Sequence, residues 1–273
     1  MSDEIRSYTD AEKFNEARML LHRFYKNMSH GYMLSQSMLK AENLYPDQHA
    51  LMAKIQHIFV ACLRYVTDLN FMQENDALTQ PRIAQHSICE VLQSIADTLN
   101  EILFIDTDAH IDFQYKGEDI LMDLDVPRME YILFSVIENS LQYGPKDVKI
   151  TLGLKKTDKQ LYITIKEKSA AIAEKDFEAL FSKYKKITSG TINPTVHQGL
   201  SLALAKQAAL EMDGNLLAEN QKTGLKITLI LPMRSTHVKE KDTAYTLAPE
   251  KVIVLFADYL LRKAEAQSNE NKC

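Results

Sequence analysis

The sequence predicts an α+β protein made of an N-terminal helical hairpin followed by a mixed or antiparallel sheet with helices on one face. Two observations lead to this prediction. The first 75 residues have apolar residues at helical spacing throughout, and the chain after residue 82 alternates between helical and strand-like patterns. These changes in pattern place the hairpin at residues 1–78, the α/β part at 79–234, and a partly helical tail at 235–273.

Apolar spacing defines two helices in the hairpin. No glycine or proline interrupts Ala11–Ser29, and a second helix follows Pro46. In that second helix, apolar residues alternate four-residue and three-residue steps at Leu51, Ile55, Ile58, Cys62, Tyr65, Leu69 and Met72. This is the seam of a coiled coil or four-helix bundle. Because one hairpin cannot cover both sides of its stripe, it packs either on the rest of the chain or on a second hairpin. We favour the second arrangement, a homodimeric four-helix bundle.

The α/β part begins after a polar segment, Glu74–Arg82. Helices are predicted at Ser87–Leu103, Pro127–Tyr143, around Asp176–Tyr184, and at Leu200–Met212. Strands are predicted from alternating polarity at His110–Tyr115, Asp119–Leu124, Val148–Leu154, Gln160–Lys166, Asn215–Glu219 and Leu225–Leu231. In the tail, Pro249–Gln267 is predicted to be an amphipathic helix, although the β-branched run Val252–Val254 would also suit a strand.

Composition narrows the class of protein. The 273 residues are 45% hydrophobic and carry a formal net charge of −5, which argues against disorder and against a basic nucleic-acid-binding surface. No apolar run reaches the roughly 18 residues of a transmembrane helix, and the first ten residues lack the pattern of a signal peptide. The three cysteines predict neither disulfides nor a metal site. We therefore expect a soluble, cytoplasmic protein without nucleic-acid or membrane partners.

Five short motifs follow one another along the chain. They lie at Phe24–His30 (FYKNMSH), Ser135–Tyr143 (SVIENSLQY), Ile165–Ile172 followed by Phe177–Tyr184, Gly199–Lys206 (GLSLALAK) and Met212–Asn215 (MDGN). In this order they resemble the phosphoacceptor motif, the N-box, the adenine-binding and aromatic boxes, and the helix after the ATP lid of bacterial sensor histidine kinases. The resemblance covers about residues 14–233 and implies a GHKL-type α/β sandwich behind a dimeric four-helix bundle.

The resemblance assigns the phosphoacceptor role to His30. The helical seam puts His30 two residues after Met28 and off the buried stripe, so that a neutral imidazole would face solvent and could attack a phosphoryl group. The alternatives are an ordinary surface histidine, or His22 as the acceptor. Gly31 stands where the family usually has an acidic residue that orients the imidazole, which argues against autophosphorylation.

The resemblance also implies a nucleotide pocket formed by Asn139, Tyr143, Glu167 and Gly199. Asn139 would ligate Mg²⁺ when nucleotide binds; the alternative is a polar residue on the exposed side of a helix. Glycines that bring the family's backbone close to base and phosphates are replaced at Ser169, Ala171 and Ser201. Each lost hydrogen bond to a charged group costs about 1.5–3 kcal/mol. We therefore expect a degenerate site without a resident cofactor, which binds MgATP weakly or not at all.

Together these features predict a two-component phosphorelay protein, a degenerate histidine kinase that works as a histidine phosphotransferase. His30 would accept a phosphoryl group from an aspartyl phosphate on a response-regulator receiver and pass it to another. Two alternatives stay open: a soluble histidine kinase that still autophosphorylates with MgATP, and a non-catalytic dimeric scaffold that binds a response regulator. The predicted partners are a second copy of the chain, through the hairpin, and a receiver domain.

Overall fold

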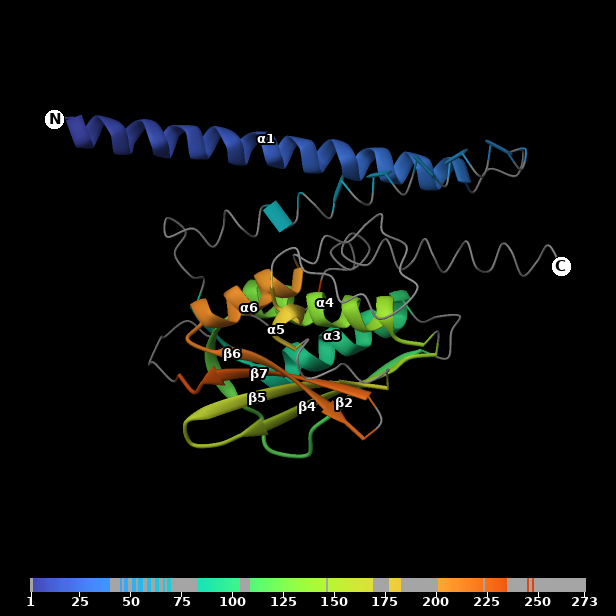
Figure 1. The fold of residues 1–273 in the computed structure, drawn as a ribbon, viewed down its shortest axis with the longest axis vertical. Coiled ribbons are helices and arrows are strands. Elements are labelled where there is room, and N and C mark those ends of the chain that lie inside the picture. The colour runs from blue at the N-terminus through green and yellow to red at the C-terminus, as the bar shows by residue number, and fades with distance from the viewer. Residues whose placement is uncertain are drawn as a thin grey trace. The chain divides into compact units, whose positions relative to one another are not determined.

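The computed structural model describes residues 2–39, separate positions between 45 and 69, the ranges 83–103, 109–145, 147–168, 177–182, 201–222 and 224–234, and residues 245 and 247. The chain divides into two compact units, Met1–Thr79 with Leu260–Cys273, and Gln80–Tyr259. The helix predicted at Pro249–Gln267 lies outside the described residues, as do Ser169 and Ala171. The first unit is helical and the second is an α/β sandwich (Figure 1).

In the first unit, helix α1 runs from Ser2 to Leu39, which confirms the predicted first helix and extends it at both ends. The described positions from Asp47 to Leu69 are also helical, as predicted. The two helical stretches meet at Gly31 and Phe59, where a Cβ atom added to Gly31 would lie 2.3 Å from the Phe59 ring. A side chain at residue 31 would therefore displace the Phe59 ring from its place in this contact.

In the first unit, the buried residues of the second helical stretch differ from the predicted seam. Leu63 and Val66, which lie outside that seam, are buried, whereas the seam residues Leu51, Ile58 and Leu69 are between 45% and 63% exposed. On one face of α1, large apolar side chains are also exposed, namely Leu20, Phe24, Leu34 and Met38. Two apolar stripes are therefore uncovered among the described residues of this unit.

The second unit contains a five-stranded sheet with strand order β2-β4-β5-β7-β6. Its strands are β2 (His110–Gln114), β4 (Lys149–Lys156), β5 (Gln160–Glu167), β6 (Asn215–Gln221) and β7 (Gly224–Pro232). Strand β2 is parallel to β4 and the other neighbours are antiparallel, so the sheet is mixed, in agreement with the prediction. Helices α3 (Ile88–Leu103), α4 (Val126–Tyr143) and α6 (Ser201–Glu211), with the short α5 (Phe177–Leu180), lie on one face of it (Figure 1).

The predicted strand at Asp119–Leu124 is β3 (Leu121–Asp125), and it lies outside the large sheet. It pairs antiparallel with β1 (Ile83–Ser87), a strand that the sequence analysis missed. The sequence Ile-Ala-Gln-His-Ser is short and has no sustained alternation, so it gave no period to detect. Strand β1 ends at Ser87, directly before helix α3, and the Ser87 hydroxyl accepts a hydrogen bond from the backbone N–H of Glu90 in that helix at 3.1 Å.

The core of this unit follows from alternation on the strands and from the apolar face of α4. Inward-facing strand residues such as Leu152 and Ile163 are fully buried, as are Ile132 and Val136 on α4. Helix α4 begins at a proline and an N-cap, Asp125, whose carboxylate accepts from the backbone N–H of Arg128 at 3.2 Å. The helix has the ends that the sequence predicts, and it is held rigidly by the core.

Candidate functional site

Helices α4 and α6 pack together and run in opposite directions. Arg128, in the first turn of α4, has its Nε 3.8 Å from Oε2 of Glu211, the last residue of α6. Just beyond α6, a Cβ atom added to Gly214 would lie 2.3 Å from the carbonyl oxygen of Ile230, near the end of β7. The C-terminal half of α4 and the N-terminus of α6 therefore lie at the other end of the domain, where β7 begins.

Two predicted site residues, Asn139 and Glu167, lie at that other end together with Ser201, and we call it the Asn139 end. Asn139 lies in the fourth turn of α4 and its side chain is half-buried. Glu167 is the last residue of β5, is 8% exposed, and stands opposite Leu225 at the start of β7. Ser201 is the first residue of α6. Gly199 and the side chain of Tyr143 lie outside the described residues.

The Asn139 end carries groups that fit a nucleotide with its metal ion. An amide oxygen, as in Asn139, is a ligand that Mg²⁺ accepts, and the buried carboxylate of Glu167 can accept hydrogen bonds from an amino group. The N-terminus of α6 offers backbone N–H groups and the positive end of the helix dipole. Among the described residues, no three His, Cys, Asp or Glu side chains form a metal site.

Lys206 connects α6 to its neighbours and was missed by the sequence analysis. Its Nζ lies 5.4 Å from the centroid of the Phe181 ring, just after α5, and donates to the backbone oxygen of Leu216 at 2.6 Å and to the side chain of Asn215. Burial lowers the pKa of Lys206. The sequence signal that could have identified Lys206 is that it is a single lysine among the alanines and leucines of an apolar helix. Through Lys206, the segment after α5 is fixed to α6 and β6.

In the first unit, the side chain of His30 is exposed on α1, in agreement with the prediction from the seam. Lys26, one turn earlier, and Met33, one turn later, are exposed as well. A side chain at the neighbouring position would require the ring of Phe59 to move, because the ring occupies the space next to Gly31. Packing between the two helices therefore explains why His30 has no acidic neighbour at residue 31.

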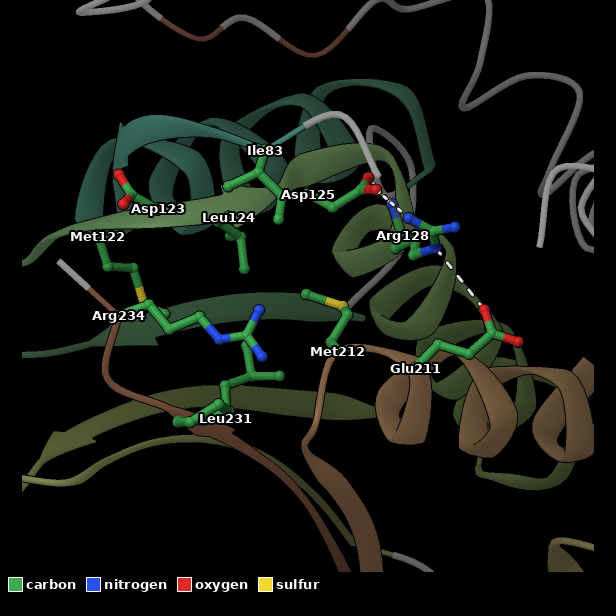
Figure 2. A pocket seen from close by; sticks show the side chains of 11 residues that line it. Ile83, Met122, Asp123, Leu124, Asp125, Arg128, Glu211, Met212, Leu231 and Arg234 are labelled. Atoms are coloured by element: carbon green, nitrogen blue, oxygen red, sulfur yellow. Dashed lines mark hydrogen bonds and ion pairs between the residues drawn. The ribbon is translucent and has the colours of Figure 1, made fainter. Parts of the chain in front are cut away.

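A pocket lies at the end of the second unit opposite the Asn139 end (Figure 2). The side chains of Met122, Leu124, Met212 and Leu231 line it together with charged groups of β3, α4, α6 and the end of β7. Arg128 forms an ion pair with Asp125 and a longer one with Glu211, and Arg234 is paired with Asp213. The sequence analysis predicted no residue of this pocket. Both arginines of the pocket thus form ion pairs with carboxylates that come from β3, α6 and the turn after α6.

Residues 124–235 match the family described as histidine kinase-, DNA gyrase B-, and HSP90-like ATPase. Among curated proteins, the sensor histidine kinase WalK of Bacillus subtilis is 25% identical over 140 residues, which are 50% of this chain and 23% of WalK. The sensor histidine kinase CssS of the same organism is 22% identical over 167 residues, 61% of this chain and 35% of CssS. The chain thus matches about a quarter to a third of the length of these relatives.

Solved structures that share the fold include those of ShkA and ThkA. Full-length ShkA in complex with AMPPNP has a TM-score of 0.63 at 15% identity, covering 81% of this chain and 46% of ShkA. Histidine kinase ThkA in complex with the response regulator protein TrrA has a TM-score of 0.55 at 16% identity, covering 84% of this chain and 67% of that one. Among the described residues, no helix combines the length and the apolar character needed to span a membrane.

Proposed function

We propose that this chain, which is a histidine-kinase-like protein with an ATPase-type domain, is a phosphorelay protein whose His30 carries phosphoryl groups between receiver domains. The observation that supports this most is the surrounding of His30. The imidazole of His30 is exposed, and the space beside the next residue, Gly31, is occupied by the ring of Phe59. His30 is accessible, but it has no carboxylate at position 31 to activate it for attack on ATP.

An acyl phosphate makes the transfer feasible without that carboxylate. One imidazole nitrogen of His30 attacks the phosphorus, a P–N bond forms, and the P–O bond to the aspartyl carboxylate breaks. The aspartate leaves as a carboxylate, and the other ring nitrogen releases its proton to solvent. The reverse sequence with a second receiver regenerates the neutral imidazole. Partner exchange of this kind needs an exposed histidine, and His30 is exposed on α1.

The ATPase-type domain is proposed to bind MgATP weakly or not at all. A bound nucleotide would supply phosphate oxygens to Mg²⁺, with the amide oxygen of Asn139 as a protein ligand and Glu167 as an acceptor for the adenine amino group. Side chains at Ser169, Ala171 and Ser201 take the place of glycines that would let the backbone approach the base and phosphates. These changes leave the polar groups in place but reduce the room for the nucleotide.

The hairpin is proposed to form a homodimeric four-helix bundle. The uncovered stripes described above, Leu20 to Met38 on α1 and Leu51 to Leu69 on the following helix, are the surfaces that a second hairpin would bury. Sedimentation of the wild type and of Leu34→Glu tests this, with Ser37→Glu, an exposed position on the same helix, as the matched control. We expect a dimer for wild type and control and a monomer for Leu34→Glu; a monomeric wild type would contradict the bundle.

A receiver domain is the proposed partner, supported by the fold that this chain shares with ThkA, which was solved in complex with a response regulator protein. The decisive experiment mixes the chain with a receiver carrying a labelled aspartyl phosphate and compares wild type, His30→Gln and His22→Gln. His22 is an exposed histidine on the same helix and is therefore the matched control. We expect label on wild type and on His22→Gln but none on His30→Gln. Absence of label on the wild type would refute the phosphotransfer function.

A kinase that still uses ATP is the second candidate, because Asn139 and Glu167 retain the polar groups of a nucleotide site. Calorimetric titration with MgATP distinguishes it. Tight binding that is lost in Asn139→Ala, together with transfer of the γ-phosphate to His30, would favour the kinase over the phosphotransferase. Receiver binding that is unchanged in His30→Ala, without any phosphotransfer, would instead indicate a non-catalytic scaffold.

A further inference from the structure

Two residues that follow the matched family region, Tyr245 and Leu247, lie against helices α3 and α4 of the second unit. The hydroxyl of Tyr245 donates a hydrogen bond to Oε1 of Glu130, a carboxylate on α4 that is only 5% exposed. The backbone N–H of Leu247 donates to Oγ of Ser94 on α3 at 3.2 Å. Leu247 itself is 1% exposed, so its side chain is an apolar anchor.

The chemistry of these contacts is that of a bound ligand segment. A buried carboxylate is costly unless it is hydrogen-bonded, and the hydroxyl of Tyr245 supplies such a bond to Glu130. Burial and the negative charge of Glu130 raise the pKa of Tyr245 well above its ordinary value, so the hydroxyl keeps its proton and remains a donor. Tyr245 and Phe113 also flank an open groove along α3, next to Ser94. One aromatic anchor and one aliphatic anchor thus engage two helices.

We propose that the surface formed by α3 and α4 is a docking site for a segment of the form Tyr-x-Leu, and that its occupant is Tyr245 to Leu247 of the same chain. Tyr245 reaches α4 through its hydroxyl and Leu247 reaches α3 through its backbone N–H, so two positions that are two residues apart in sequence hold the segment on this surface. The carboxylate of Glu130 makes the surface prefer a hydroxyl donor at the first position. The burial of Leu247 makes it prefer an aliphatic side chain at the third position. The proposal is independent of phosphotransfer by His30.

Competition between the chain's own segment and an added peptide tests the proposal. The probe is a fluorescently labelled peptide with the sequence of residues 241–251, and its binding is followed by anisotropy. In the wild-type full chain the tethered segment competes at an effective concentration of about millimolar, so the peptide binds poorly. In the full-length variant Tyr245→Ala/Leu247→Ala the surface is vacated, and we expect a Kd at least tenfold lower.

A matched control removes the same two residue types elsewhere. The variant Tyr162→Ala/Leu217→Ala changes positions on β5 and β6, and it should bind the peptide as poorly as the wild type. A peptide in which both anchors are alanine should not bind the vacated surface. Equal affinity of the wild type and the Tyr245→Ala/Leu247→Ala variant for the peptide, or binding of the peptide without anchors, would overturn the proposal.

A milder variant guards against loss of structure. Tyr245→Phe removes only the hydroxyl that bonds Glu130, and far-UV circular dichroism checks that the variant stays folded. We expect it to bind the peptide several-fold more tightly than the wild type does. Hydrogen exchange in the same variant should rise over α3 and α4 and stay unchanged in the β4–β5 hairpin. Unchanged peptide affinity, or exchange that rises over the whole domain alike, would contradict docking at this surface.

Discussion

Substituting alanine for Gly31 measures how tightly the two helices of the hairpin pack beside His30. A Cβ atom there would lie 2.3, 2.4 and 2.9 Å from three carbon atoms of the Phe59 ring. Alanine in place of glycine inside a helix normally stabilises by about 0.8–1 kcal/mol. Overpacking of a closed contact costs about 1–3 kcal/mol. The difference leaves Gly31→Ala destabilising by about 1 kcal/mol.

The same substitution should change sign when the ring is removed. In a Phe59→Ala background no ring atom remains next to residue 31, so Gly31→Ala should stabilise the protein by about 1 kcal/mol through helix propensity alone. The double-mutant cycle then has a coupling energy of about 2 kcal/mol, within the range of residues in direct contact. This coupling is the quantity that the structure predicts.

Urea unfolding followed by far-UV circular dichroism gives the four free energies, fitted with separate transitions for the two units. Asn27→Ala, at an exposed position of α1, is the control for a substitution that meets no neighbour and should give no coupling with Phe59→Ala. Stabilisation by about 1 kcal/mol in both backgrounds would refute the reasoning, because it would mean that the Phe59 ring does not contact Gly31. Gly31→Glu, which adds a larger side chain at the same place, should then also be tolerated.

Three further predictions concern the second unit. Arg128→Met removes the cation paired with the buried Asp125 and should lower the free energy of unfolding in urea by about 3 kcal/mol, whereas the exposed Arg23→Met should have almost no effect. Gly224 has φ +140° and a Cβ there would lie 1.8 Å from a carbonyl oxygen of β5, so Gly224→Ala should cost about 3 kcal/mol or more in the same assay. Burial opposes ionisation of Asp119, but hydrogen bonds from neighbouring hydroxyl, thiol and amide groups outweigh it and lower its pKa. The stability that Asp119 contributes is therefore present above its unfolded pKa of about 3.9 and lost as the pH falls below it, so Asp119→Asn should be less stable than wild type at neutral pH and approach it in acid.

Local signals in the sequence account for the parts of the fold that were predicted. The β4–β5 hairpin follows from alternation on both strands and from a polar turn, in which the backbone N–H of Thr157 donates to the carbonyl oxygen of Gln160 at 2.8 Å. Helix α4 follows from its apolar pattern, which starts at Pro127 and ends before Gly144. Strand β1 was missed because its partner β3 is distant in sequence, and five residues without alternation carry no period.

The residues of the candidate site were predicted from the sequence, but their positions relative to one another in the fold were not. Periodicity alone put His30 on the exposed side of its helix, and the structure agrees. That Asn139 and Glu167 share one end of the domain depends on the direction of α4 against α6, which no local pattern contains. The bond between Tyr245 and Glu130 joins residues on separate elements, and neither residue gives a signal by itself. The absence of a side chain at Gly31 was visible in the sequence, but its cause, the Phe59 ring, was not.

The parallel pairing of β2 with β4 has a consequence for the order in which the sheet assembles. Between these two strands the chain passes through β3 and α4, whereas β4 and β5 are joined by a short turn. Closing the longer loop costs more chain entropy, so the hairpin can form early while β2 joins after α4 is in place. Substitutions in the hairpin should then slow folding, and substitutions in β2 should chiefly speed unfolding. The edge strand that completes the sheet is thus also the part of it that is released first.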